Sequence, residues 1–173
     1  EFPLPPSAAG YPEGLAQSYS YESFANAAAQ AGLSDGTVSG NLRLLVNEES
    51  SYKVSMANAV AQSLTAFGLT VTVETLPWED YLSALERGDF DLYYGEVRLG
   101  ADWDVSALIG AGGALNYGGW YSEETERLLS ACDTASDRSA ALYALYEHLQ
   151  AEMPMIPICF KSLSVLTHSG TVE

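Results

Sequence analysis

The chain has 173 residues and a formal net charge of −16, from 23 acidic and 7 basic side chains. Nucleic acids and anionic membranes are bound through basic surfaces, so this charge excludes both as partners of the chain's own surface. Apolar residues make up 47% of the sequence, which is enough for a folded core and excludes intrinsic disorder. A single domain is expected at this length.

Residues 1–19 are rich in Pro, Gly and Ser and predict an irregular arm, which lies on a surface or leads to a missing part of the protein. The chain opens without a methionine, which indicates a piece of something larger.

In chain order, residues 20–173 predict a helix at 20–32, a strand at 42–46, a helix at 51–68, a strand at 69–76, a helix at 77–88, a strand at 90–97, a glycine-rich loop with a short helix at 106–121, helices at 123–132 and 137–152, and strands at 155–160 and 163–168.

The hydrophobic pattern supports the two central helices. Apolar residues recur at helical spacing from Val54 to Leu64, and again at Trp78, Tyr81 and Leu85. Each stripe ends at a glycine, as helices commonly do. Further along the chain, Ser122 is placed to cap the helix that follows it.

Strands and helices alternate between residues 42 and 97, which is typical of an α/β fold with parallel strands. Right-handed crossovers then predict an open sheet with strand order 2-1-3 and helices on both faces. In that order the loops that leave the first and third strands open a crevice at the carboxyl ends of the strands. Those loops are "NEESS" and "RLGADWD", so a ligand is expected beside residues 98–104.

The residues with catalytic or metal-binding chemistry do not form a known motif. Asp102 and Asp104 are open to three interpretations, namely an acid–base pair, a cation site or two solvated acids. His148 and His168 have no ligand-spaced partner, so both are expected to be structural or exposed. No nucleophile elbow or phosphate-binding loop is present, and we therefore expect no cofactor, no metal and no enzymatic activity.

The two cysteines, Cys132 and Cys159, stand in apolar stretches and predict two buried free thiols, with a disulfide as the alternative. Trp103 and Trp120 fall in predicted loops, where an indole either folds back into the core or forms a platform for a ligand. Asp102 beside Trp103 suits a primary ammonium, since a carboxylate neutralises its charge and an indole makes a cation–π contact.

Six stretches, in the same order, resemble the C-terminal lobe of the extracytoplasmic solute-binding proteins of the peptide/nickel class, which serve ABC importers of oligopeptides and dipeptides. They are "YSYESFANAAAQAGL", "LRLLVNEES", "FGLTVTVETLPWEDYLSALERGDFDLYYG", "GADWD", "NYGGWYSEETERLL" and "LYALYEHLQAEMPMIPICF". The resemblance covers nearly the whole chain. It implies a lobe of the type II periplasmic-binding-protein fold that captures peptides outside the cell membrane and presents them to a permease.

The resemblance also implies roles for individual residues. Asp102 matches the aspartate that holds the α-ammonium of a bound peptide, and Trp103 stands at the family's neighbouring aromatic position. Asn116 and Tyr117 match a stretch near the ligand. Arg98 departs from the family pattern, so it either pairs with Asp102 or reaches a ligand carboxylate.

The partners implied are a peptide, the missing N-terminal lobe of the same protein and the permease subunits. The protein would be periplasmic or lipid-anchored on the outer face of the cell membrane. The alternatives that remain open are the same fold with another small solute, such as a nickel complex or an oligosaccharide, and a hydrolytic enzyme domain.

Overall fold

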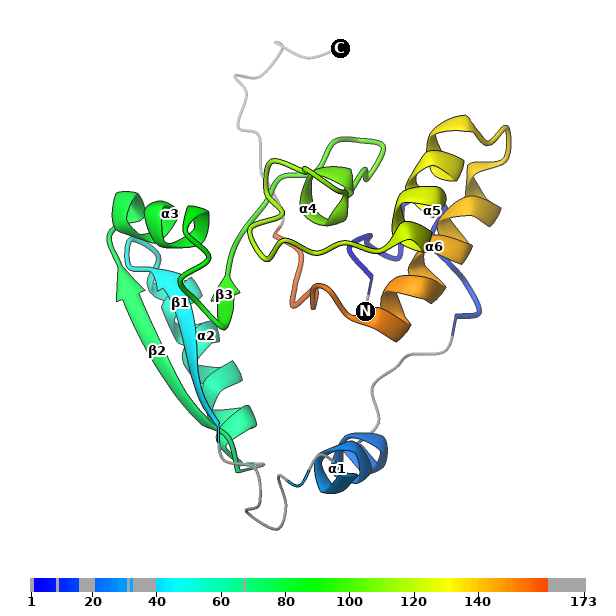
Figure 1. Cartoon of the computed structure of the whole chain (residues 1–173). Helices are drawn as coiled ribbons and strands as arrows, with labels where there is room; N and C mark the ends of the chain where they lie inside the picture. The colour runs from blue at the N-terminus through cyan, green and yellow to red at the C-terminus, as the bar shows by residue number, and fades with distance from the viewer. Residues whose placement is uncertain are drawn as a thin grey trace, which may run out of the picture.

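The computed structural model describes residues 2–8, 10–15, 21–30, 32, 40–66 and 68–161. The elements in chain order are α1 (Tyr21–Gln30), β1 (Asn41–Asn47), α2 (Ser51–Thr65), β2 (Thr70–Leu76), α3 (Trp78–Glu86), β3 (Leu92–Tyr94), α4 (Ser106–Ile109), α5 (Glu123–Thr134) and α6 (Arg138–Glu152) (Figure 1).

The strands form an open parallel sheet in the order β2-β1-β3, which confirms the predicted α/β topology. The central strand, β1, pairs with both neighbours, so that Leu44 lies opposite Val73 on one side and Leu92 on the other. The last four residues of β1 are buried, as expected for a strand that is covered on both faces.

The two faces of the sheet are covered by different helices. Leu44 and Val46 pack with Ala57 of α2, whereas Leu45 packs with Tyr81 and Leu85 of α3. This alternation follows from the two-residue period of a strand. Strands β1 to β3 with α2 and α3 form what we call the sheet unit.

Helices α4, α5 and α6 form a second unit with the start of the chain, which we call the helical unit (Figure 1). Phe2 and Leu4 are buried in its core, and the Phe2 ring lies 5.4 Å from that of Tyr146. The described part of the arm is irregular. Its first apolar side chains, Phe2 and Leu4, nevertheless complete the core of the helical unit. The arm boundary at residue 19 stays a prediction.

The helix ends follow the predicted capping chemistry where they are described. Ser122 accepts a hydrogen bond from the Thr125 backbone at the start of α5, as predicted. Asp137, which was expected inside the last helix, caps α6 by accepting from the Ser139 nitrogen. Gly32, the expected end of α1, has a φ of +76°, which is the left-handed conformation that glycine adopts readily. Residue 20, where that helix was expected to begin, lies outside the described residues.

Three sequence predictions are corrected, namely the strand at 155–160, the burial of Cys159 and the length of the third strand. The strand expected at 155–160 is wrong, because that segment joins no described strand; Pro157 there lacks an N–H donor. The strand expected at 163–168 lies outside the described residues, as does His168. Both cysteines are free, but Cys159 is exposed, so only Cys132 is the buried thiol that was predicted. The third strand is also shorter than expected, spanning only Leu92–Tyr94.

Candidate functional site

The loops that leave β1 and β3 meet at the carboxyl edge of the sheet, as the strand order predicts. Lys53, near the start of α2, forms an ion pair with Glu96 after β3, with Nζ 3.4 Å from Oε2. Glu49, in the loop after β1, accepts a hydrogen bond from the Trp78 backbone at 2.7 Å. The starts of α2 and α3 and the exit of β3 are thus joined at one edge.

A polar network supports this edge, and it was not foreseen from the sequence. Asn47 is buried at the end of β1, donates to Glu49 Oε2 at 2.9 Å and accepts from Lys53 Nζ at 3.4 Å. The Asn47 amide lowers the pKa of Glu49, and Lys53 lowers the pKa of Glu96. The signal available in the sequence was a set of polar residues directly after two adjacent parallel strands.

Residues 95–105, which we call the crossing loop, lead from β3 to α4 and contain a tight turn. The Trp103 backbone donates to the Gly100 carbonyl at 3.1 Å. Trp103 has a φ of +56°, in a region that bulky residues seldom adopt and that is enriched at functional sites. Its indole is half-buried against the helical unit. Trp103 is therefore both a packing residue and a candidate ligand contact.

Asp102 points its carboxylate over the turn and is exposed. Its Oδ1 accepts one long hydrogen bond, 3.4 Å from the Asp104 nitrogen. A Cβ on Gly100 would lie 2.6 Å from the same oxygen, so a larger residue there would displace the Asp102 carboxylate. Among the described residues, no cation forms an ion pair with Asp102.

The other charged residues of the crossing loop have distinct positions. Asp104 bonds both the nitrogen and the hydroxyl of Ser106, at 2.9 and 2.7 Å, and so holds the start of α4. Arg98 is exposed and pairs with no acid in the described part of the chain. The described ion pairs thus contain no Arg98–Asp102 contact, and the two acids of the loop are not equivalent.

Asn116 and Tyr117 are directed into the protein. The Asn116 amide donates to the Gly110 and Trp120 carbonyls at 3.1 and 2.8 Å and accepts from the Trp120 nitrogen at 2.9 Å. Tyr117 packs edge-to-face on Tyr93, with ring centroids 6.1 Å apart. Asn116 thus braces the loop before α5, and Tyr117 joins the core of the sheet unit.

Two exposed aromatic side chains stand near the carboxyl edge. Trp78 is 48% exposed and stacks on Tyr81, with centroids 5.8 Å apart, and Tyr52 at the start of α2 is 58% exposed. The helical spacing placed Trp78 in the buried stripe of its helix. It is instead exposed, at the first residue of α3.

The described residues offer little for catalysis or metal binding. They contain no group of three or more His, Cys, Asp or Glu side chains that could hold a metal ion. His148 has the structural role expected, because its Nε2 lies 2.9 Å from the hydroxyl of the buried Thr125. Asp102 and Asp104 each accept a hydrogen bond from the backbone nitrogen two residues further along the chain.

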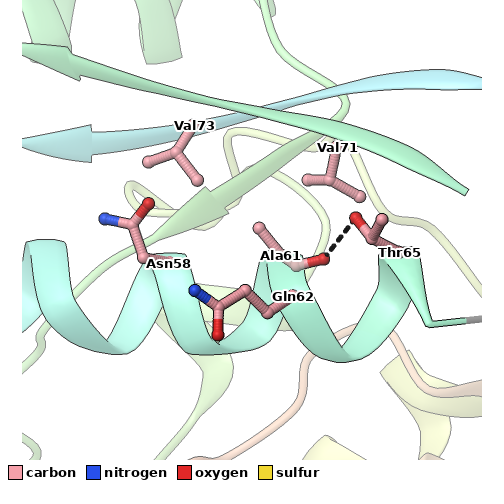
Figure 2. A pocket seen from close by; sticks show the side chains of 6 residues that line it. All are labelled: Asn58, Ala61, Gln62, Thr65, Val71 and Val73. Carbon is pink, nitrogen blue, oxygen red and sulfur yellow. Dashed lines mark hydrogen bonds between the residues drawn. The ribbon is translucent and has the colours of Figure 1, made fainter.

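A groove of about 350 Å³ lies apart from this site, between α2 and the edge strand β2 (Figure 2). Its lining residues are Asn58, Ala61, Gln62, Thr65, Val71 and Val73. Thr65 donates its hydroxyl to the Ala61 carbonyl, 2.8 Å away, in the helix wall. The groove contains no ionisable side chain and lies toward the amino end of β2, so we do not assign the ligand site to it.

The family model of the bacterial extracellular solute-binding proteins, family 5 Middle, matches residues 1–116. A comparison with curated protein sequences found no match. The solved structures to which the chain is similar include the three binding proteins that follow, two of which were determined with a bound peptide.

The oligopeptide-binding protein AppA from Bacillus subtilis, in complex with a nonapeptide, matches with a TM-score of 0.73 and 19% identity over 88% of this chain and 35% of AppA. The periplasmic binding protein DppA from Helicobacter pylori, in complex with the peptide STSA, matches with a TM-score of 0.72 and 21% identity over 88% of this chain and 31% of DppA. The murein tripeptide binding protein MppA from Escherichia coli matches with a TM-score of 0.71 and 23% identity over 87% of this chain and 31% of MppA.

These similarities confirm the predicted fold, that of a lobe of periplasmic binding proteins. The chain spans about a third of the length of the structures it matches.

Proposed function

The chain belongs to the bacterial extracellular solute-binding proteins of family 5, and on that premise we propose that it is one lobe of a receptor that captures peptides for an ABC importer. The receptor holds its ligand without making or breaking a bond. It acts outside the cytoplasmic membrane, as a periplasmic or lipid-anchored protein. None of the helices in the described residues combines the length and the apolar composition that a membrane span requires.

The observation that carries this proposal is the Asp102 carboxylate, which is exposed in the loop that leaves β3 and has no cationic partner among the described residues. In this proposal Asp102 binds the α-ammonium of a peptide, and the indole of Trp103 lies beside that charge. A buried ammonium–carboxylate pair is a strong, directional contact once a ligand excludes water.

Arg98 supplies the opposite charge on the same loop. In a chain with a net charge of −16, an exposed guanidinium that pairs with no described acid is available to a ligand carboxylate. We assign it the peptide C-terminus or an acidic side chain, since guanidinium and carboxylate match in geometry. Asn116 and Tyr117 contribute indirectly. Asn116 holds the loop before α5, and Tyr117 packs in the core of the sheet unit.

A second lobe, outside this chain, supplies the opposite wall of the site and closes on the peptide about a hinge. One lobe alone provides contacts on a single side, while the ligand still loses its translational and rotational freedom. Titration calorimetry of the 173-residue chain with di- to pentapeptides should therefore detect no binding tighter than roughly millimolar. Micromolar binding would refute the two-lobed mechanism.

The test of the amine anchor uses the receptor in which this lobe is joined to its partner lobe. Removing one member of a desolvated charge pair costs about 2–5 kcal/mol, so Asp102→Ala should weaken a peptide with a free N-terminus by about 30-fold or more. Asp133→Ala is the matched control, because Asp133 is an exposed acid at the end of α5. Asp104 is unsuitable as a control, since its substitution would release the start of α4.

The same titration distinguishes the alternative ligands. A peptide with an acetylated N-terminus should bind the parent receptor poorly and be almost indifferent to Asp102→Ala. If acetylated and free peptides bind the parent alike, Asp102 is not an amine anchor. The ligand should then be sought among nickel complexes, oligosaccharides or other solutes without an amine. Release of amino acids from a bound peptide would instead indicate a hydrolytic enzyme.

A further inference from the structure

Residues 155–161, which we call the returning segment, follow α6 and run back toward the sheet unit (Figure 1). The segment joins no described strand, and its Ile156 and Phe160 side chains are 71% and 45% exposed. Three of its consecutive residues nevertheless contact separate parts of the site. Cys159 lies with its Sγ 3.3 Å from the Tyr52 hydroxyl on α2. Burial alone therefore does not explain the course of this segment.

The returning segment contacts the start of the crossing loop through an ion pair. Lys161 Nζ lies 3.5 Å from Oε1 of Glu96, and Lys53 Nζ lies 3.4 Å from the other carboxylate oxygen. Lys53 is itself fixed, since it donates to Asn47 at the end of β1 and its side chain is only 16% exposed. Glu96 is thus held between α2 on one side and the returning segment on the other.

The same segment contacts the far part of the crossing loop through an aromatic pair. The rings of Phe160 and Trp103 lie edge-to-face, with centroids 6.5 Å apart and planes at 89°. This is the geometry that aromatic pairs favour. Trp103 also has a positive φ, a conformation that persists only where surrounding contacts hold it. Phe160 is one of those contacts.

Arg98 and Asp102 lie between Glu96 and Trp103 in the sequence, so both candidate ligand residues stand on a stretch that is held at two points by one segment. We propose that the returning segment positions the crossing loop for ligand capture, with Phe160 and Lys161 as positioning residues that do not touch the ligand. The link to capture rests on the proposed function. Without the two contacts, the loop would have to be ordered when the ligand binds, at the expense of affinity.

Fluorine NMR of the 173-residue chain labelled with 5-fluorotryptophan tests the positioning without any ligand. The chain has three tryptophans, so each resonance can be assigned with a single Trp→Phe variant. In Phe160→Leu, which keeps an apolar side chain but removes the ring, the Trp103 resonance should shift and broaden while that of Trp120 stays. Phe160→Tyr keeps the ring and should leave the Trp103 resonance near its parent position.

Ile156→Ala is the matched control, because Ile156 lies on the same segment with a more exposed side chain than Phe160. It should leave all three tryptophan resonances unchanged. An unchanged Trp103 resonance in Phe160→Leu, or an equal shift in Ile156→Ala, would overturn the proposal.

Amide hydrogen exchange tests the ionic contact. The Trp103 amide is bonded to the Gly100 carbonyl at 3.1 Å, so its exchange rate reports the order of the turn. Lys161→Gln should speed this exchange by roughly 1.5- to fivefold. Because the Lys161 and Glu96 side chains are 70% and 46% exposed, about 1 M salt should raise the parent rate to that of the variant. A Lys161→Gln rate equal to the parent's at low salt would exclude a role for this ion pair.

Peptide affinity tests whether the positioning of the crossing loop contributes to ligand capture. In the two-lobed receptor, Phe160→Leu should weaken peptide binding by roughly two- to tenfold, while Ile156→Ala leaves it unchanged. A receptor that binds no peptide would refute the proposed function, and the fluorine spectra would still decide the positioning. A shifted Trp103 resonance with unchanged peptide affinity would refute the link between positioning and capture.

Discussion

The hydroxyl of Tyr146 is predicted to destabilise the protein, so its removal should raise stability. Tyr146 is fully buried in the helical unit, and its hydroxyl has no hydrogen-bond partner in the described part of the chain. A buried polar group without a partner costs about 1–3 kcal/mol. Tyr146→Phe deletes that hydroxyl and keeps the ring, which packs on Phe2.

We expect Tyr146→Phe to stabilise the protein by about 1 kcal/mol, because the small void left by the oxygen offsets part of the gain. For a chain of this size that corresponds to a rise in Tm of about 2–4 °C. Tyr81→Phe is the matched comparison, since the Tyr81 hydroxyl donates to the Tyr94 carbonyl at 3.2 Å. That variant should lose about 0.5–1.5 kcal/mol.

The pH dependence gives the same prediction an independent readout. Burial raises the pKa of Tyr146 from 10.0 to about 12. The pKa is higher in the folded state, so the stability linked to this proton is fully present below pH 10 and is lost as the pH rises through 12. Tyr146→Phe should therefore lose less stability than the parent between these two pH values.

Urea unfolding followed by circular dichroism, at neutral and alkaline pH, measures both effects. If Tyr146→Phe is destabilised by more than about 0.5 kcal/mol, the hydroxyl has a partner and the reasoning from its burial is wrong. If Tyr81→Phe is destabilised and Tyr146→Phe is not, the assay resolves the loss of a single hydrogen bond.

Three further variants test the packing that supports the site, each by thermal and urea unfolding. Gly113→Ala should lose about 1–3 kcal/mol, because its Cβ would lie 2.5 Å from the Ala107 carbonyl oxygen; unchanged stability would show that α4 moves freely. Ser122→Ala should lose about 1 kcal/mol, because the hydroxyl caps α5 through the Thr125 nitrogen, and Ser122→Asp should restore most of that loss. Leu45→Ala should lose about 2–5 kcal/mol, as for other buried leucines, and a loss under 1 kcal/mol would contradict its place at the centre of the sheet.

Local chemistry was sufficient to predict the helices and the three strands of the sheet, and their order. The stripe from Val54 to Leu64 and the glycine after it defined α2, and the Ser122 cap defined the start of α5. Alternation of strands and helices then led to the order β2-β1-β3, since right-handed crossovers leave few other arrangements. The position of the crossing loop at the carboxyl edge followed from that order.

The roles of individual loop residues depended on contacts between distant parts of the chain. Tyr117 is next to Asn116 in sequence, yet its ring packs on that of Tyr93, on β3. Trp78 continues an apolar stripe, yet it is exposed at the first residue of α3. No periodicity distinguishes a half-buried residue from an exposed one at the end of a helix.

The sequence alone thus determined the sheet, its helices and the edge where a ligand site would form, because propensity, capping and hydrophobic period act between residues close in the chain. Only the tertiary structure decided that Phe2 completes the core around Tyr146, and that Lys161 and Phe160 meet the crossing loop. These contacts join residues that are far apart in the chain, and their formation depends on the relative placement of two units. That placement is set by the shape of packed side chains, which no local pattern encodes.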